Sequence, residues 1–156
     1  MPEAKVLTVS DGVASGHRVD RSGAALQECL RRAGYDVVGQ WVIADGAANV
    51  ERMLRELSRG FAGLIVTTGG TGFGPRDETP EGTRRVIERE ATGLVLGMFA
   101  ANPDKGRLSR ATAGATGAAL VVNTPGSTKG AVECLEAILD VVPHALDLLA
   151  GRPTEH

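Results

Sequence analysis

Hydrophobic residues along this chain fall into two alternating patterns: short continuous apolar runs, and longer stretches with helical spacing. The apolar runs at residues 5–10, 36–43, 63–67 and 118–123 predict four buried strands. Between the runs, apolar side chains recur every three or four residues, which is typical of helices that bury one face. The last of these helical stretches, residues 132–149, is the longest and most regular.

Residues with capping chemistry stand at the start of three predicted helices. Ser22 and Asn49 are expected to cap the first two, and each of these helices ends at a glycine. The third begins at Thr79-Pro80-Glu81, which supplies a capping hydroxyl, a proline in the first turn and an early acid. Pro143 predicts a kink inside the last helix.

Three regions give mixed or irregular patterns. Residues 88–101 are rich in apolar side chains, but Gly93 and Gly97 interrupt the helical spacing. Residues 102–106 predict a loop, and residues 108–115 are expected to be helical.

The alternation of strands and helices predicts an α/β fold with three layers, in which helices cover both faces of a mainly parallel sheet. The length of 156 residues and the hydrophobic fraction of 42% fit one domain with a substantial core. We expect this domain to occupy residues 1–150, followed by a flexible tail at residues 151–156.

Charge and hydropathy limit the expected partners. The formal net charge of -2 gives no general attraction to nucleic acid. We find no run of about 18 apolar residues and no basic segment followed by an apolar leader, so we expect a cytoplasmic protein that does not bind a membrane. The two cysteines, Cys29 and Cys134, lack metal-site spacing and are expected in the core or at its edge.

A glycine-rich loop follows the third strand, at residues 69–74, and the helix start at Thr79 comes shortly after it. Glycines let backbone N–H groups approach an anion closely, so this loop predicts a phosphate site. It is not a Walker loop, because Gly74 is followed by Pro75-Arg76 and not by Lys-Ser/Thr. The spacing of its glycines does not match a dinucleotide fingerprint either.

Asp45 and Asp77 lie at or just beyond the carboxyl ends of two predicted strands, where α/β sheets bind their ligands. Two carboxylates beside a bound phosphate repel it unless a cation lies between them, and Mg²⁺ is suited to that position. The alternative is that Asp45 is only a turn residue and Asp77 only an early helix acid.

Other polar residues near these strand ends are suited to bind phosphate oxygens. The hydroxyl groups are those of Thr68, Thr71, Ser109 and Ser127, and the nearest cations are Arg76, Arg110 and Lys129. Lys129 is the best placed of the cations because it follows a second loop of ligand-binding type, Pro125-Gly126-Ser127.

Several motifs, in this order, resemble the MogA/MoaB family of molybdenum cofactor biosynthesis proteins. They are Ser10-Asp11-Gly12, Asp20-x-Ser22-Gly23, Thr68-Gly69-Gly70-Thr71-Gly72, Asp77-x-Thr79-Pro80-Glu81, Ser109-Arg110-Ala111 and Pro125-Gly126-Ser127. The glycine loop joined to the Asp-x-Thr-Pro-Glu motif is the most specific part, and the resemblance covers nearly the whole chain.

The resemblance implies an α/β domain that forms a homotrimer, binds molybdopterin and contacts other molybdenum cofactor enzymes. In the adenylyltransferase branch, Mg²⁺ and ATP adenylylate the molybdopterin phosphate and pyrophosphate is released. The resemblance places Asp45 and Asp77 as the catalytic and Mg²⁺-binding residues. It implies a nucleotide end formed by Ser10, Asp11 and the loop from Gly69 to Gly72, and a pterin end formed by Ser109, Pro125, Gly126, Ser127 and Lys129. Thr68 is included among the residues that bind one of the two ligands.

Some positions depart from the usual pattern of this family. Thr92, Leu94 and Leu96 replace a proline, an aromatic residue and a glutamate, and Thr124 stands where leucine is common. The missing glutamate leaves open a pterin-binding protein without catalysis, which stores or delivers the pterin. A third hypothesis is a structural or regulatory trimer with a vestigial pocket, in which the carboxylates of Asp45 and Asp77 would lie in different environments.

Overall fold

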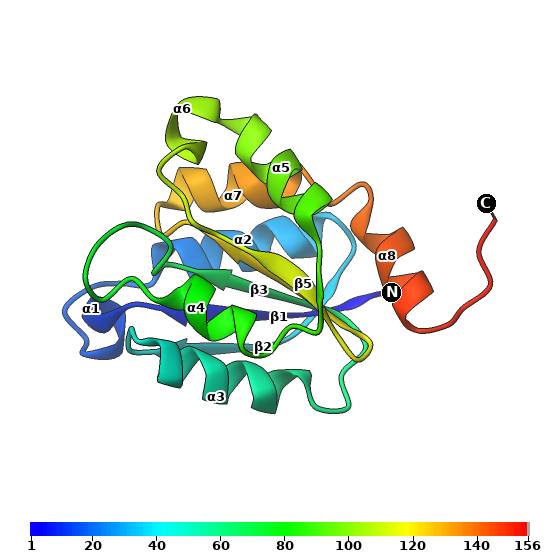
Figure 1. Ribbon diagram of the computed structural model, residues 1–156, viewed down its shortest axis with the longest axis horizontal. Coiled ribbons are helices and arrows are strands. Elements are labelled where there is room, and N and C mark those ends of the chain that lie inside the picture. Colours follow the sequence, from blue (N-terminus) through cyan, green and yellow to red (C-terminus); the bar gives the residue numbers. More distant parts are fainter. Residues whose placement is uncertain (156) are drawn as a thin grey trace.

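A six-stranded sheet lies between two layers of helices in the computed structural model, which describes residues 1–155 (Figure 1). The strand order is β2-β1-β3-β6-β5-β4. The strands are β1 (Glu3–Val9), β2 (Asp36–Ile43), β3 (Leu64–Thr68), β4 (Arg89–Glu90), β5 (Ala113–Thr116) and β6 (Ala119–Thr124). The first four strands in the spatial order are parallel, and β5 is antiparallel to both of its neighbours. The predicted three-layer, mainly parallel α/β fold is confirmed.

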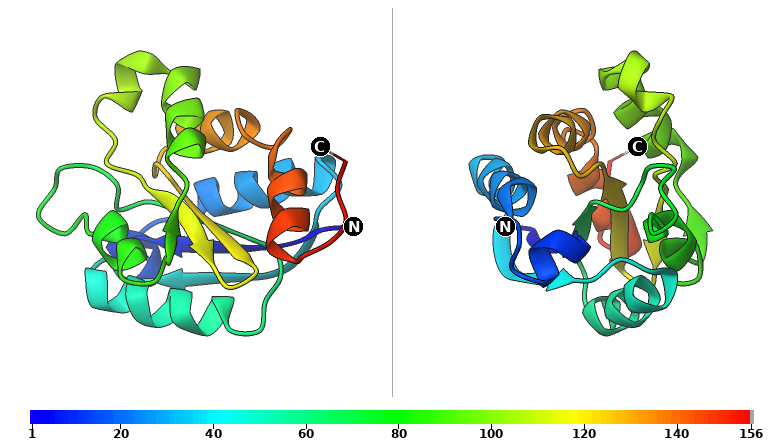
Figure 2. Two further views of the ribbon diagram at one scale, coloured as in Figure 1. Left: turned by 45° about the vertical axis from the view of Figure 1, so that its right-hand side comes forward. Right: turned by 90° about the vertical axis from the view of Figure 1, so that its left-hand side faces the viewer.

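The helices divide between the two faces of the sheet (Figures 1 and 2). They are α1 (Asp11–Ala14), α2 (Arg21–Arg32), α3 (Ala47–Ser58), α4 (Thr79–Arg84), α5 (Thr92–Ala101), α6 (Pro103–Gly106), α7 (Thr128–Glu136) and α8 (Val142–Leu149). Helices α2, α5, α7 and α8 pack over one face, while α3 and α4 cover the other. None of the helices within residues 1–155 is both long and apolar enough to cross a membrane.

Two hydrophobic cores follow from the alternation of side chains along the central strands. On β1, Val6 belongs to the core beneath α2 and α7, whereas Leu7 belongs to the core beneath α3. On β3, Val66 and Ile65 divide in the same way. Because both faces of these parallel strands are buried, their sequences read as continuous apolar runs.

The helix predicted at residues 108–115 is wrong. Residues 113–116 form β5, which turns at Gly117 and pairs antiparallel with β6. Gly117 has a φ of 55°, a left-handed conformation that glycine adopts at low cost. The alanines of β5 are buried. Their small side chains, which suggested a helix, allow the strand to pack closely between the layers on either face of the sheet.

Several predicted loops and boundaries also differ from the structure. The loops expected after β1 and at residues 102–106 contain the single-turn helices α1 and α6. The mixed region at residues 88–101 forms β4 and α5. The final helix is two helices, with Pro143 in the first turn of α8 and not at a kink.

The three predicted helix caps are replaced by other residues. Asp20, not Ser22, caps α2 by accepting from the Gly23 N–H at 3.0 Å. Helix α3 begins after Gly46, and Asn49 instead donates to the Asp45 carbonyl at 3.0 Å. Thr79 lies inside α4, where its hydroxyl donates to the Gly69 carbonyl. The last residue of the expected tail, His156, lies outside the described residues.

Candidate active site

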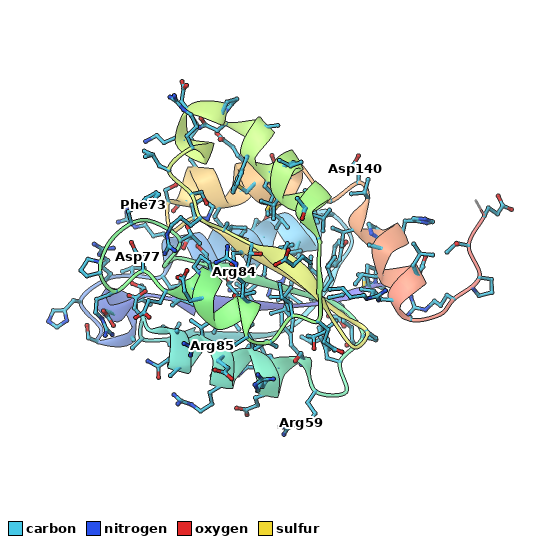
Figure 3. The ribbon with its side chains drawn as sticks, in the orientation of Figure 1. Arg59, Phe73, Asp77, Arg84, Arg85 and Asp140 are labelled. Carbon is cyan, nitrogen blue, oxygen red and sulfur yellow. The ribbon has the colours of Figure 1, made fainter. Side chains whose placement is uncertain are left out.

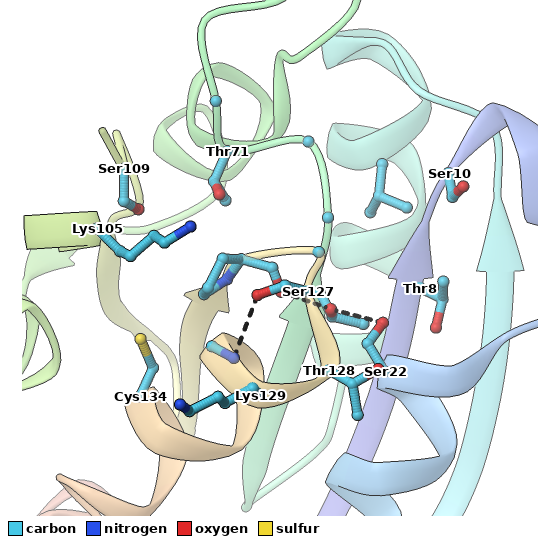
Figure 4. A pocket seen from close by; sticks show the side chains of 18 of the residues that line it. Thr8, Ser10, Ser22, Thr71, Lys105, Ser109, Ser127, Thr128, Lys129 and Cys134 are labelled. Atoms are coloured by element: carbon cyan, nitrogen blue, oxygen red, sulfur yellow. Dashed lines mark hydrogen bonds between the residues drawn. The ribbon is translucent and has the colours of Figure 1, made fainter. Parts of the chain in front are cut away.

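A cavity of about 890 Å³ lies at the carboxyl ends of β1, β3 and β6 (Figure 4). All but one of the catalytic and binding residues that the family resemblance implies line this cavity. These are Ser10, Asp45, Thr68, Gly69, Gly70, Thr71, Gly72, Asp77, Ser109, Pro125, Gly126, Ser127 and Lys129. The exception is Asp11, whose side chain points to Arg76 and Asp45.

The glycine loop lies against the loop that follows β6. The Gly69 N–H donates to the Thr124 carbonyl at 3.1 Å, and the Thr68 hydroxyl donates to the Pro125 carbonyl at 2.8 Å. Gly69 and Gly70 have φ values of 98° and 69°. A Cβ at Gly69 would lie 2.2 Å from the Val9 carbonyl oxygen, so no side chain fits there. The fully buried Thr68 hydroxyl therefore joins the two loops, although the sequence suggested it as a phosphate ligand.

Arg110 holds the far side of the glycine loop. Its guanidinium donates to the Gly72 carbonyl at 2.7 Å and forms an ion pair with Glu81 at 2.7 Å. The backbone N–H of Arg110 donates to the Thr71 carbonyl at 2.9 Å. Arg110 does not line the cavity. Thus this cation, predicted to lie near bound phosphate, fixes the shape of the loop through bonds within the protein.

Asp45 and Asp77 border the same glycine loop. A Cβ at Gly70 would lie 3.1 Å from Asp45 Oδ1, and a Cβ at Gly72 would lie 3.0 Å from Asp77 Oδ2. Burial raises the pKa of Asp45 above its ordinary value, and the charges of Asp11 and Asp77 raise it further. A cation bound beside Asp45 and Asp77 would offset the repulsion between these carboxylates and favour the ionised form of Asp45.

The donor set of the cavity fits Mg²⁺ only when a ligand completes it. Among residues 1–155, no group of three or more His, Cys, Asp or Glu side chains is arranged to hold a metal ion. Mg²⁺ is commonly held by one or two carboxylates together with substrate phosphates. Asp45 and Asp77 are suited to that arrangement.

Two serines in the cavity wall cap helices. Ser10 Oγ accepts from the Val13 N–H and Ser127 Oγ accepts from the Gly130 N–H, each at 3.2 Å. Each hydroxyl uses its oxygen for the cap and keeps its hydrogen for a ligand. Ser127 and Lys129 also stand at the start of α7, where the helix dipole favours an anion (Figure 4).

Three cations in the wall escaped the sequence analysis: Arg18, Arg21 and Lys105. Within residues 1–155 none of them forms an ion pair, whereas Lys129 lies 3.8 Å from Glu133. Arg18 and Arg21 flank the Asp20 motif, and Lys105 precedes Ser109 by four positions. Their closeness in sequence to motif residues could have indicated that these cations lie at the site.

The remaining wall is partly apolar and includes α5 and α7. Met98 and Phe99 line it, together with Cys134, whose thiol lies 3.8 Å from the Met98 carbonyl oxygen. Cys29 is buried in the core. Burial raises the pKa of both thiols, in keeping with the predicted packing roles.

A profile of the family described as "Probable molybdopterin binding domain" matches residues 5–144. The chain belongs to this family. The resemblance read from the motifs is confirmed.

Other members of the molybdopterin-binding family align with most of the chain. The crystal structure of the molybdopterin biosynthesis enzyme MoaB from Thermus thermophilus is 41% identical, with a TM-score of 0.91 and coverage of 99% of this chain and 100% of that one. The molybdopterin adenylyltransferase of Helicobacter pylori strain 26695 is 34% identical over 94% of this chain and 87% of its own length.

Longer relatives contain much more than this domain. Gephyrin from Dictyostelium discoideum is 32% identical over 95% of this chain, which corresponds to 22% of gephyrin. The chain spans between 22% and 49% of the length of the first three curated relatives that it matches.

Proposed function

We propose that this chain is a molybdopterin adenylyltransferase of molybdenum cofactor biosynthesis. In the reaction, an oxygen of the molybdopterin phosphate forms a bond to the α-phosphorus of ATP, the bond from that phosphorus to the pyrophosphate oxygen breaks, and pyrophosphate leaves. The observation that supports this most is that Asp45 and Asp77 border one glycine loop in one cavity. The Helicobacter pylori relative of that name adds support.

The residues of the cavity have distinct proposed roles. Ser10 and the loop from Gly69 to Gly72 bind the nucleotide, and Ser109 with the segment from Pro125 to Lys129 binds the pterin. Asp11 does not line the cavity and acts through its contacts with Asp45. The volume of about 890 Å³ lies at the upper end of the range of roughly 300–1,000 Å³ for ligand pockets, which suits two ligands. Asp45 and Asp77 would hold Mg²⁺, which neutralises charge on the phosphates.

Replacement of Asp77 by asparagine tests the proposal. Asp77→Asn keeps the shape of the side chain but removes its charge, so we expect adenylyl transfer to fall by at least about 100-fold while molybdopterin binding changes by less than about twofold. The measurement is formation of adenylylated molybdopterin and of pyrophosphate from molybdopterin, Mg²⁺ and ATP.

Asp140→Asn is the matched control, because Asp140 is exposed between α7 and α8, far from Asp77 (Figure 3). It should retain full activity. Turnover by Asp77→Asn at the wild-type rate would contradict the proposal, as would a wild-type protein that binds the pterin but transfers no AMP.

The second candidate function is pterin binding without catalysis, and Leu96 favours it because a glutamate is usual there. In the structure Leu96 is 63% exposed on α5 and does not line the cavity of the single chain. The lost carboxylate therefore does not alter this cavity directly. The assay distinguishes the two functions, since a storage protein releases no pyrophosphate. The third hypothesis, a vestigial pocket, fits less well, because the carboxylates of Asp45 and Asp77 lie beside the same glycine loop.

A further inference from the structure

Arg76, Asp11 and the Asp45 backbone form a connected set of hydrogen bonds beside the cavity, which we call the Arg76 clasp. Arg76 Nε and Nη2 donate to the two carboxylate oxygens of Asp11 at 2.9 and 3.0 Å. Arg76 Nη2 also donates to the Asp45 carbonyl at 3.0 Å. The clasp joins the end of the glycine loop to the start of α1 and the turn after β2.

Asp11 and Asp45 bind each other in both directions. The Asp11 N–H donates to Asp45 Oδ2 at 2.9 Å, and the Asp45 N–H donates to Asp11 Oδ1 at 3.1 Å. Asp45 Oδ2 is therefore engaged within the protein. Asp45 Oδ1 is directed instead toward Gly70, where a Cβ would lie 3.1 Å from it.

The clasp is separate from the surface that meets a ligand. Asp45 lines the cavity, but Asp11 and Arg76 do not. Arg76 Nε and Nη2 both donate to groups of the protein, namely the Asp11 carboxylate and the Asp45 carbonyl. Bidentate pairing of an arginine with a carboxylate fixes the orientation of both side chains. The sequence suggested Arg76 as a cation near phosphate, whereas its contacts in the structure are with Asp11 and Asp45.

From these contacts we infer that Arg76 is a positioning residue: through Asp11, it holds Asp45 so that Oδ1 faces the cavity and is available to a divalent cation. The inference rests on the proposed function, because it assigns Asp45 to the metal. Groups that orient a metal ligand typically affect metal affinity by about 10- to 100-fold.

Simple electrostatics predicts the opposite effect, which makes the test sharp. Removal of a positive charge near Asp45 should strengthen binding of a divalent cation by Coulomb attraction alone. Loss of a positioning contact should instead weaken binding of the cation. The direction in which Arg76→Ala changes cation affinity therefore distinguishes a positioning role from a purely electrostatic effect.

The experiment measures Mn²⁺ binding by electron paramagnetic resonance in the presence of α,β-methylene-ATP. We expect Arg76→Ala to weaken Mn²⁺ binding at least about 10-fold and Arg76→Lys to have a smaller effect. Arg32→Ala is the control, because Arg32 also pairs with a carboxylate on an exposed surface, that of Glu28 on α2, and should change nothing.

Two further measurements exclude other roles. Binding of the analogue in EDTA should change by less than about twofold, because Arg76 is not a phosphate ligand. In the ligand-free protein, the Asp11 amide should exchange with solvent at least about 10-fold faster in Arg76→Ala than in the wild type. In an Asp11→Ala background, Arg76→Ala should weaken Mn²⁺ binding less than it does in the wild type, because the contact between the two side chains is already lost and only the Arg76 bond to the Asp45 carbonyl remains.

Unchanged or tighter Mn²⁺ binding by Arg76→Ala would overturn the inference, and so would weaker binding of the analogue in EDTA or an unchanged Asp11 exchange rate. In each of these cases the proposed function stands if the wild type binds Mn²⁺ and transfers AMP. A wild-type protein that binds no Mn²⁺ with the analogue overturns the proposed function and this inference together.

Discussion

Tyr35 lies in the core beneath α2 and is only 3% exposed. Among residues 1–155, it is the one residue with a buried side-chain nitrogen or oxygen that has no hydrogen-bond partner. Burial also raises the pKa of Tyr35 to about 12. The hydroxyl therefore costs free energy at neutral pH and costs more when it ionises.

We expect Tyr35→Phe to increase the free energy of unfolding by about 1 kcal/mol at pH 7, because it removes a buried polar group without a partner. Urea denaturation measures this change. Above pH 10 the tyrosine of the unfolded chain ionises before that of the folded chain, so the wild type should lose about 2 kcal/mol more than the variant between pH 10 and 12. A variant less stable than the wild type at pH 7 would show that the hydroxyl has a partner in solution.

At this scale the sequence predicted most of the motif residues that line the cavity, but it missed Arg18, Arg21 and Lys105 and did not show which side chains bind one another. The segments that end at Ser10, Asp45 and Asp77 could be placed at strand ends by pattern alone. The partners of Arg76 could not, because Asp11 is 65 positions away in the chain. The same holds for Arg110 and Glu81, which become neighbours only when the segment before β5 lies along the glycine loop.

The start of helix α2 is hydrogen-bonded to the sheet beside the cavity through Asp20. Asp20 caps the helix through Oδ1, while its Oδ2 accepts from the Thr8 hydroxyl and the Gln40 amide, both at 2.8 Å. One carboxylate therefore connects α2 with β1 and β2. Thr8 is only 2% exposed, so its hydroxyl depends on this partner.

Asp20→Ala should lower the free energy of unfolding by about 2 kcal/mol, because it removes a helix cap and leaves the Thr8 hydroxyl without its acceptor. Chemical denaturation tests this. Asp36→Ala is the control, since Asp36 is exposed on β2 and its side chain forms no hydrogen bond within residues 1–155. Equal stability of the two variants would contradict the role assigned to Asp20.

Element types followed from sequence where apolar spacing was regular, as in α2, α3 and β1. They failed where tertiary contacts overrode local preference. The alanines of β5 favour a helix in isolation, but pairing with β6 and burial make them a strand. Single turns such as α1 are too short to leave a periodic signal.

In the whole molecule, helix α5 projects from one side of the sheet together with α6 (Figures 1 and 2). It has no charged residue and only one buried residue, Met98, and Leu96 is 63% exposed. An apolar helix left exposed in one chain suits contact with a second copy.

The fold class itself was predictable, because alternation of strands and helices leaves few arrangements of layers.

We expect the protein to sediment as a homotrimer, with a mass about three times the 16.2 kDa of one chain. Leu96→Arg should reduce this mass, because it places a charge on the apolar contact. Leu148→Arg is the matched control on α8, where Leu148 is 48% exposed. Analytical ultracentrifugation measures both. A monomeric wild type would contradict the assembly, and dissociation by Leu148→Arg alone would place the contact on α8.

The residues around the cavity come from positions as far apart as Thr8 and Cys134, so the cavity exists only after the parallel strands have assembled. A compound that occupies it has no binding site on the unfolded chain or on a fragment. Binding is therefore linked to the folding of the entire domain, and at a concentration 100 times its dissociation constant such a compound adds about 2.7 kcal/mol to stability. In the cell, compounds that bind in the cavity would then also protect the protein from proteolysis.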